Sequence, residues 1–209
     1  MHFKTTPLFR AFAAAALMGV AGIAGAGPIP AFEYAEATLA NQPSRNVMLG
    51  YSFMVAAPTV VTSLAYFSGS GASSHQVGLW DADKRLLAAD TVLASDPLSG
   101  HYRYHAIGAL TLAPGQLYYV AGLSLGNLFA YSPTEMAMAP GIKFMANSYS
   151  GATTSLQFPQ LSFAPEGGPY IGGSFGISAV AVPEPRAITL VLTGLAMIGL
   201  MACHRRKKH

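Results

Sequence analysis

The chain has 209 residues, of which 52% are hydrophobic and 10% are charged, and its formal net charge is +3. This length accommodates one domain together with targeting segments, and the charged fraction is well below the quarter that is usual in soluble domains. The positive charge does not indicate nucleic-acid binding, because residues 27–182 carry eight acidic and five basic residues, a net charge of −3. This central part has no cluster of basic residues that would displace counterions from phosphate groups.

The only cysteine, Cys203, lies at the end of an apolar run near the C-terminus. The central part of the chain therefore forms no internal disulfide and offers no thiolate ligand to a metal ion. We expect its stability to come from core packing, and we expect no cofactor and no bound metal.

The first 26 residues have the organisation of a secretory signal peptide. Lys4 and Arg10 give a positively charged start, and residues 11–23 are an unbroken run of apolar and small residues. An uncleaved membrane anchor is the alternative, but a run of 13 residues is too short for a hydrocarbon core of roughly 30 Å. Small residues define the expected cleavage site, which comprises Ala24, Ala26 and Gly27.

The central part of the chain shows the pattern of strands. Residues 27–50 form an entry segment in which prolines disfavour a long helix, and residues 32–39 fit either a short helical turn or a first strand. Residues 51–181 contain short apolar runs bounded by Gly, Pro, Asn, Asp and Ser, without an apolar stripe at the helical period. They predict an all-β domain, an antiparallel, jelly-roll-like β-sandwich of roughly eight to ten strands. The expected strands are residues 51–55, 59–67, 74–80, 86–93, 102–107, 116–123, 142–146 and 170–180, and residues 148–169 are expected to form a long surface loop with one irregular strand.

The sequence His101-Tyr102-Arg103-Tyr104-His105 has two histidines within five residues and is a candidate metal-binding or catalytic segment. On a strand the two histidines share a face with the arginine, and the tyrosines occupy the other face. Two residues four positions apart are about 13 Å apart at roughly 3.3 Å per residue, too far to bind one metal ion together. We therefore expect a strand with a polar outer face and a tyrosine inner face.

Asp81-Ala82-Asp83 resembles half of a calcium-binding loop. Calcium needs six to eight oxygen ligands, but no acidic or Asn residue follows within six positions, and Lys84 and Arg85 repel a cation. A hairpin turn is the favoured interpretation, and calcium held by several loops of the sandwich stays open.

No motif indicates an enzyme, because neither a nucleophile elbow nor a phosphate-binding loop with a helix behind it is present. We therefore predict no catalytic residues. Trp80 is the candidate ligand contact, since an aromatic face can stack on a sugar ring. The alternative is that Trp80 seals the end of the core, as large aromatic side chains usually do.

The last 28 residues contain three ordered elements, which are a Pro-rich peptide at residues 182–186, an apolar run at residues 187–203 and a basic tail at residues 204–209. A helix of 17 residues spans about 25 Å, which is barely enough to cross a bilayer core. The basic tail cannot easily cross, so it stays on the cytoplasmic side and the body lies outside. The residues that set this topology are Arg205, Arg206, Lys207 and Lys208.

The prolines at 183 and 185 keep the residues before them extended, which gives a processing enzyme an accessible peptide beside the membrane. Val182, Pro183, Glu184 and Pro185, followed by the apolar run and the basic tail, resemble the PEP-CTERM sorting signal, whose C-terminal segment is also catalogued under the name of ice-binding proteins. The resemblance implies a Gram-negative bacterium, recognition by an exosortase, and association with exopolysaccharide or biofilm. The body has no flat array of threonines, so we do not infer ice binding.

The body more weakly resembles an uncharacterised secreted β-sandwich domain, for which no catalytic residues are implied. The usual glycine of the hairpin after Trp80-Asp81 is absent, and Asp83-Lys84-Arg85 stands in its place. The matching pieces are residues 60–67, 74–81, 86–88, 102–104 and 110–120.

The sequence thus predicts an exported, non-enzymatic protein of the cell surface or extracellular matrix. It would be held briefly in the inner membrane, cut by an exosortase-type enzyme, and associated with exopolysaccharide. One alternative is a secreted carbohydrate-active hydrolase, which requires side chains that converge in a cleft, drawn from Asp81, Asp90, Asp96, His75, His101 and His105. A purely structural matrix component without a ligand is the other.

Overall fold

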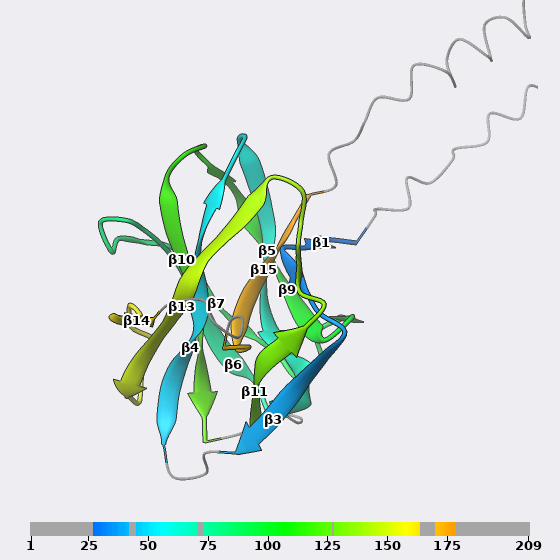
Figure 1. Cartoon of the computed structure of the whole chain (residues 1–209), viewed down its shortest axis with the longest axis vertical. Coiled ribbons are helices and arrows are strands. Elements are labelled where there is room, and N and C mark those ends of the chain that lie inside the picture. The colour runs from blue at the N-terminus through cyan, green and yellow to red at the C-terminus, as the bar shows by residue number, and fades with distance from the viewer. Residues whose placement is uncertain (1–26, 42–44, 71–72, 127, 164–169, 179–209) are drawn as a thin grey trace, which may run out of the picture.

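The computed structural model describes residues 27–41, 45–70, 73–126, 128–163 and 170–178 (Figure 1). Two main sheets contain most of the strands, and every pairing is antiparallel. In spatial order, the five-stranded sheet comprises β1 (Ile29–Pro30), β15 (Gly173–Ile177), β5 (Thr59–Phe67), β9 (Tyr102–Leu112) and β8 (Leu98–Ser99). The six-stranded sheet comprises β14 (Leu161–Phe163), β13 (Ile142–Ala152), β4 (Asn46–Val55), β10 (Leu117–Leu125), β6 (His75–Asp81) and β7 (Leu86–Val92).

Two small ribbons and one short helix complete the described structure. β11 (Leu128–Thr134) pairs with β3 (Glu36–Asn41), and β12 (Ala137–Met138) pairs with β2 (Phe32–Glu33). The 3₁₀ turn η1 (Ser68–Ser70) follows β5. The prediction of an all-β, antiparallel fold is confirmed.

The path of the chain alternates between the two main sheets. One sheet contains the order β1-β15-β5-β9 and the other the order β4-β10-β6-β7. Among these eight strands, each step along the chain passes to the other sheet, except the hairpin from β6 to β7. Strands β11 to β14 lie between β10 and β15 in the sequence, and of these β13 and β14 extend the six-stranded sheet beyond β4, whereas β11 and β12 belong to the two small ribbons.

The core lies between the facing surfaces of these sheets. Phe53 of β4 and Phe175 of β15 are fully buried, with ring centroids 4.7 Å apart. Leu64 of β5 and Val120 of β10 are also fully buried. The sheets approach closely where Gly173 of β15 lies on the backbone of β10, because a side chain at that position would overlap the main chain of β10. Buried apolar residues of the longer strands supply this core, and β15 is buried at all five positions.

The entry segment is part of the fold and consists of strands. Residues 27–50 contribute β1, β2, β3 and the first half of β4, so the expected sandwich boundary at residue 51 falls inside a strand. The N-terminal strands belong to the domain because they cover part of its core. Tyr102 and Tyr104 of β9 are 1% and 5% exposed, and Phe32 of β2 packs on Tyr102 with ring centroids 6.4 Å apart. The predicted alternation of tyrosines with polar side chains is present, and the N-terminal strands help to cover the tyrosine face.

The predicted surface loop at residues 148–169 is wrong in its first part, because β13 continues to Ala152 and pairs with β4. Its serines, Ser148 and Ser150, are buried, and the hydroxyl of Ser150 accepts a hydrogen bond from the amide of Met48. The polar residues of this segment led to the prediction of a loop, although the segment is a buried strand. Residues 153–160 form no strand, and residues 161–163 form β14.

The predicted signal peptide at residues 1–26 and the sorting segment at residues 182–209 lie outside the described residues. Among the residues that are described, no helix is long and apolar enough to cross a bilayer.

Four turns and the ends of the described chain lie at the same end of the domain (Figure 1). The turns cover residues 56–58, 82–85, 113–116 and 139–141. The amide of Ala56 donates to the carbonyl of Gly141, and the amide of Gly115 donates to the carbonyl of Val55. β1 pairs with the last residues of β15, so the chain enters and leaves the domain side by side. We call this the turn end.

His75, on β6, is buried, and its surroundings disfavour the protonated ring. Its ring stacks on Tyr66 at 3.8 Å, and Nδ1 lies 2.9 Å from the carbonyl oxygen of Leu123. Burial lowers the pKa of His75 below its ordinary value of 6.5, and the hydrogen bond to Leu123 only partly opposes this. The unfolded chain therefore binds a proton at His75 more readily than the folded protein does. The free energy of unfolding is unaffected by this group above pH 6.5, and it decreases as the pH falls from 6.5 toward the lower pKa of the folded state.

We therefore expect the free energy of unfolding to fall below pH 6.5 by up to about 1.4 kcal/mol per pH unit from this one group. Urea titrations of the wild type and His75→Phe between pH 8 and pH 4.5 measure this. The variant loses a hydrogen bond, so it is less stable at pH 8, but its stability depends less steeply on pH. Equal slopes in the two proteins would contradict the assignment.

Candidate ligand-binding cleft

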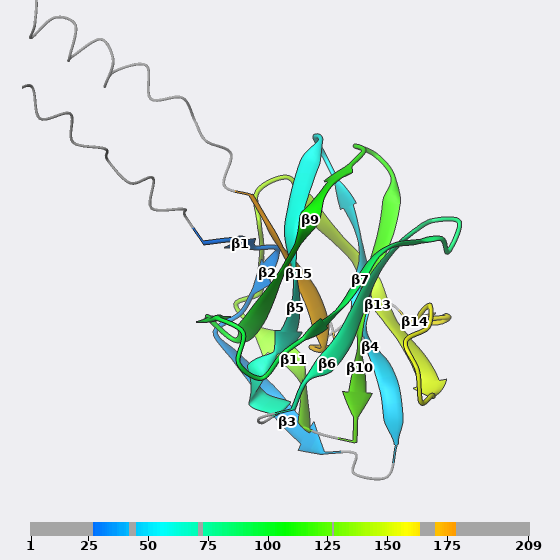
Figure 2. The same ribbon diagram turned by 180° about the vertical axis from the view of Figure 1, so that it is seen from behind.

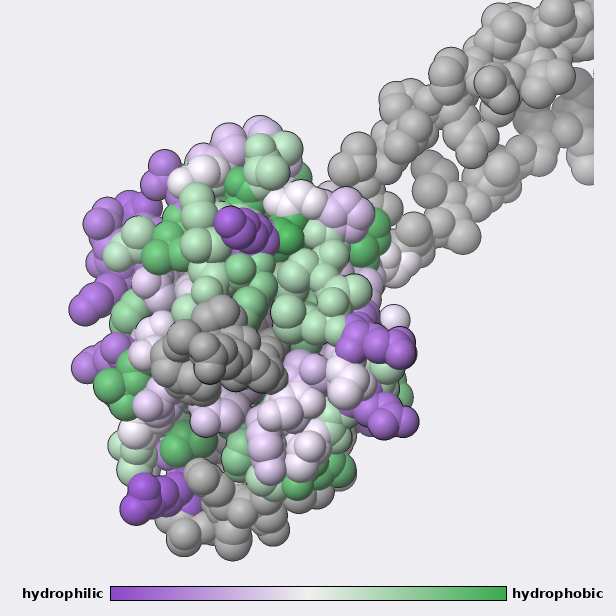
Figure 3. Space-filling view, viewed as in Figure 1, coloured by the Kyte–Doolittle hydropathy of each residue, from purple (hydrophilic) through white to green (hydrophobic). Residues whose placement is uncertain are grey.

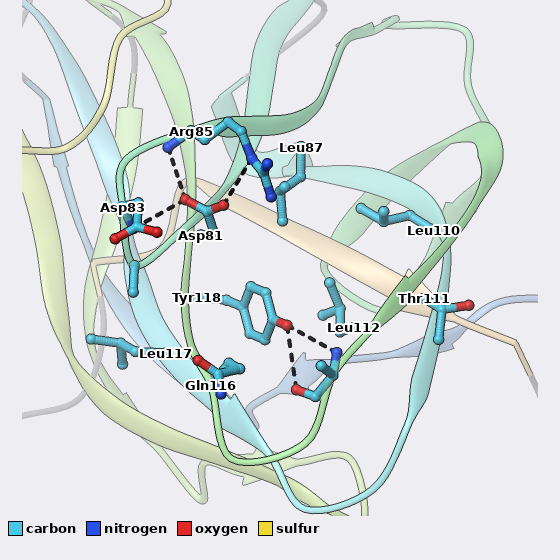
Figure 4. A pocket seen from close by; sticks show the side chains of 12 residues that line it. Asp81, Asp83, Arg85, Leu87, Leu110, Thr111, Leu112, Gln116, Leu117 and Tyr118 are labelled. Carbon is cyan, nitrogen blue, oxygen red and sulfur yellow. Dashed lines mark hydrogen bonds and ion pairs between the residues drawn. The ribbon is translucent and has the colours of Figure 1, made fainter.

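A cleft of about 430 Å³ lies at the turn end, between the edges of the two main sheets (Figure 4). Leu87 of β7 and Leu110 of β9 stand on its two sides, with Asp81 and Arg85 above and Tyr118 below in that view. The other lining residues are Ala82, Asp83, Thr111, Leu112, Ala113, Gln116 and Leu117. The cleft therefore has aliphatic sides and a polar rim.

The topology explains why the domain is open here. β7 is the last strand of its sheet, and β8 pairs with β9 only at Tyr102 and Arg103. The remaining length of β9 has no strand partner on that edge within the described residues. Figure 2 shows these two edges, β7 and β9, side by side on the same side of the molecule. We call the boundary between them the seam.

The turn above the cleft is held by Asp81. Its Oδ1 accepts hydrogen bonds from the amides of Asp83 and Arg85, at 3.1 and 2.9 Å, and its Oδ2 pairs with Nε of Arg85 at 3.0 Å. Lys84 adopts the left-handed backbone conformation with φ of 64°, the position for which glycine is best suited. Both oxygens of Asp81 are engaged by the turn itself, which joins β6 and β7 as a hairpin.

The wall below the cleft is fixed by Tyr118. Its hydroxyl accepts a hydrogen bond from the amide of Ala113 at 2.9 Å and donates to the carbonyl of the same residue at 3.3 Å. The side chains of Asp83, Thr111 and Gln116 are exposed and form no hydrogen bond to the described part of the protein. These three groups are therefore available to a ligand.

The seam is closed beyond the cleft by His105 of β9. Its Nδ1 lies 2.9 Å from Oδ2 of Asp96, and its Nε2 lies 3.7 Å from Oδ2 of Asp90 on β7. The same oxygen of Asp96 accepts a hydrogen bond from the amide of Leu93 at 2.7 Å, and Arg103 donates to the carbonyl of Asp96 at 2.8 Å. This cluster joins the edges of the two sheets.

The other predicted histidine lies elsewhere. His101 stacks on Tyr34 with ring centroids 4.1 Å apart, and its Nδ1 lies 3.5 Å from a carboxylate oxygen of Glu33. His101 lines a second, more open cleft of about 410 Å³ together with Tyr34, Glu36, Leu39 and Phe67. This second cleft is at the end of β9 opposite to the turn end, because Tyr102 and Leu112 are the two ends of that strand.

The six residues of the hydrolase alternative are therefore distributed over four places. Asp81 holds the turn, Asp90 and Asp96 flank His105 at the seam, His101 lies at the far end, and His75 lies in the core. Across the described ranges, no group of three or more His, Cys, Asp or Glu side chains is arranged to hold a metal ion.

Trp80, the predicted ligand contact, is only 3% exposed. It forms a second small core with Met48, Ala121 and Leu123, separate from the main core. Phe158 covers it edge-on with ring centroids 6.1 Å apart, and the ammonium group of Lys84 lies 5.5 Å from the centre of the Phe158 ring. The ring therefore presents no free face to a sugar, and it is buried in this second core rather than at the end of the main core.

No model of a known protein family, no curated protein and no solved structure matches the chain.

The sequence predicted a turn at Asp81 and Asp83, but it did not identify Thr111 and Gln116, on either side of the turn that joins β9 and β10, as candidate ligand contacts. The missing information was that the two turns lie beside each other, which depends on the pairing of β6 with β10.

Proposed function

We propose that this is an exported, non-enzymatic protein of the cell surface or extracellular matrix whose β-domain binds a matrix polysaccharide in the cleft at the turn end. The observation that carries the proposal is the combination of three unengaged polar groups, on Asp83, Thr111 and Gln116, with the aliphatic sides formed by Leu87 and Leu110. A carboxylate, a hydroxyl and an amide match the hydroxyl groups of a sugar. The apolar faces of sugar rings pack on aliphatic side chains.

The winding of the chain supports this proposal. Eight strands in two facing four-stranded sheets, with successive strands passing from sheet to sheet, follow the double Greek-key path of a jelly roll, the finer fold that we propose. Jelly rolls include lectin domains, but a fold hosts many functions, so this support is an analogy.

A non-enzymatic role fits the carboxylates of the cleft. A glycosidase of the usual kind needs two carboxyl groups facing the scissile bond, one acting as an acid and one as a nucleophile or base. Both oxygens of Asp81 are engaged by its own turn, which leaves Asp83 as the single unengaged carboxylate of the lining. A carbohydrate-active hydrolase is therefore the less favoured alternative.

Export and sorting rest on the two ends of the sequence. We propose that the signal peptide is removed before Gly27 and that an exosortase-type enzyme in the inner membrane recognises Val182, Pro183, Glu184 and Pro185. Release then delivers a slightly acidic domain to the exopolysaccharide. The pairing of Ile29 with Ile177 is consistent with this proposal, because in the sequence Ile29 follows Gly27 by two residues and Ile177 precedes Val182 by five.

The binding proposal is tested by replacing the rim groups of the cleft. We expect Asp83→Asn combined with Gln116→Ala to weaken binding of the organism's own exopolysaccharide about tenfold, since a hydrogen bond is worth roughly 0.5–1.5 kcal/mol and more when one partner is charged. Isothermal titration calorimetry measures the change. Glu36→Gln, in the second cleft, is the matched control and should bind like the wild type.

Three outcomes separate the candidate functions. A loss in Glu36→Gln alone would move the site to the second cleft. Release of reducing sugar from the polysaccharide would favour the hydrolase. Absence of binding to any matrix polysaccharide would leave a structural matrix component.

The sorting proposal predicts the ends of the mature protein. Mass spectrometry of the extracellular form should find an N-terminus at Gly27 and a C-terminus within or close to residues 182–185. An extracellular protein that still carries Cys203 and the basic tail would contradict processing at this motif.

A further inference from the structure

We propose that the polysaccharide bound by the cleft is a cationic polymer of amino sugars, and that its chain continues from the cleft along the seam to Asp90. This inference rests on the proposed function, since it names the chemical class of the ligand at the same site. It also assigns a second contact region outside the cleft. The ligand class follows from which charged groups on this side of the domain are already paired and which are left.

The first step concerns the charge that the cleft leaves unpaired. Asp81 and Arg85 form an ion pair at 3.0 Å, so their opposite charges largely cancel for a ligand in the cleft. The ammonium group of Lys84 lies 5.5 Å from the centre of the Phe158 ring, and Lys84 is not among the lining residues. The carboxylate of Asp83 is therefore the remaining charge of the lining, and its sign attracts an ammonium group.

The second step concerns the carboxylates of the seam beyond the cleft. The side chain of Asp96 is only 14% exposed, and its Oδ2 already accepts the amide of Leu93 and lies 2.9 Å from Nδ1 of His105. The side chain of Asp90 is 49% exposed, and its Oδ2 lies 3.7 Å from Nε2 of His105. Its Oδ1 accepts the amide of Thr91 at 2.7 Å. Asp90 is therefore the second carboxylate that a ligand on this side can reach.

The third step concerns the path between these two carboxylates. Asp90 follows Leu87 of the cleft by three positions on β7, a distance of about 10 Å at 3.3 Å per residue. The neighbouring edge, β9, presents exposed Ala106, Gly108 and Ala109 along the seam (Figure 2). A side chain added at Gly108 would meet no atom within 4 Å, so the surface there is open. Small uncharged residues therefore leave room for a chain of sugar rings between the cleft and Asp90.

The charge at the turn end is concentrated beside the cleft. The turns at residues 56–58, 113–116 and 139–141 contain no charged residue, whereas the hairpin between β6 and β7 contains several. In the space-filling view, hydrophilic residues gather along the left edge, the side to which this hairpin projects in Figure 1 (Figure 3). A polymer of uronic acids would bring its carboxylates close to Asp83 and Asp90, and the like charges would repel. A polymer with free amino groups is the complementary ligand.

The ligand class is tested with hexamers of glucosamine, N-acetylglucosamine and galacturonic acid. Isothermal titration calorimetry at pH 6 and low salt should give at least fivefold tighter binding of the glucosamine hexamer than of the N-acetylglucosamine hexamer, and the galacturonic acid hexamer should bind most weakly. The first two share a backbone, so their difference reports the charge, and 0.5 M salt should remove most of it by screening. Tightest binding of the galacturonic acid hexamer would overturn the inference and would make Arg85 the anchor.

The path along the seam is tested with two variants that remove a charge at nearly constant shape. Asp83→Asn should weaken binding of both the glucosamine dimer and the hexamer at least fivefold. Asp90→Asn should weaken the hexamer at least threefold and leave the dimer unchanged, because the dimer is too short to extend from the cleft to Asp90. The dimer thus also reports whether Asp90→Asn is folded. Glu36→Gln, in the second cleft, removes the same charge and should bind both like the wild type, and an equal loss there would overturn the inference.

Binding of the organism's own exopolysaccharide separates this inference from the proposed function. Suppose that this polymer binds and is lost in Asp83→Asn combined with Gln116→Ala, while the glucosamine hexamer binds no tighter than the N-acetylglucosamine hexamer. The inference then fails and the proposed function stands. If neither that polymer nor any hexamer binds, both are refuted. A hexamer affinity that falls in Asp83→Asn but not in Asp90→Asn would overturn the extension along the seam and would support the ligand class.

Discussion

Gly173→Ala is expected to cost about 3 kcal/mol of folding free energy, the upper part of the usual range for overpacking. A methyl group at this position would overlap the main chain of Ala121 and Gly122 on the facing sheet. Backbone atoms in the middle of a sheet cannot move aside as a flexible side chain can, so the two sheets must separate. Thermal unfolding and urea titration of the purified domain, followed by circular dichroism, measure the loss.

The control for this prediction is Gly108→Ala on β9. A side chain at Gly108 would meet no atom within 4 Å, and its backbone is not in the left-handed region. The same chemical change should therefore leave stability unchanged or raise it by about 0.4–1 kcal/mol, because alanine restricts the unfolded chain. If both variants lost the same stability, close approach of the sheets at Gly173 would not be the cause.

The sequence predicted the strands whose apolar residues alternate and whose ends carry turn residues. Residues 59–67 form β5 as expected, and residues 74–80 nearly coincide with β6. In these segments, local propensity and burial favour the same structure, so a single sequence suffices.

The strands that the sequence did not predict depend on tertiary contacts. β13 was expected to end at Ala146, but it continues through Asn147, Ser148 and Ser150, which are buried because β4 pairs with this strand and Asn147 accepts a hydrogen bond from the amide of Tyr170. β1 and β2 have only two residues each, and their partners are distant in sequence. Pattern within a short window contains no information about such pairings.

In the candidate site, too, some features follow from the local sequence and others depend on tertiary contacts. The hairpin at Asp81 was predictable from turn chemistry, because an Asp side chain commonly accepts hydrogen bonds from the next few amides. The cleft was not predictable, since it exists only where the edges of two sheets meet. The separation of His101 from His105 was predictable from strand geometry, whereas their different partners, Glu33 and Asp96, depend on the N-terminal segment and on the turn after β7.

Trp80→Ala is expected to cost about 3–5 kcal/mol, the usual range for removing a large buried aromatic side chain. The ring is 3% exposed and packs on Met48 and Leu123 on the face of the six-stranded sheet that residues 153–160 cover. Its removal leaves a cavity and also takes the packing partner from Phe158. Urea unfolding measured by circular dichroism checks this value, because the variant lacks the only tryptophan of the chain.

Trp80→Ala could lose polysaccharide binding either because the domain unfolds or because a sugar contact is removed. A loss that follows the unfolded fraction reflects stability, and stabilising the variant by lower temperature should restore binding through the cleft. Phe158→Ala is the complementary test, since it uncovers the ring without removing it. We expect Phe158→Ala to shift the tryptophan emission to longer wavelength and to leave the affinity unchanged. A rise in affinity on uncovering the ring would make Trp80 the sugar platform and would place the site on the outer face of the sheet.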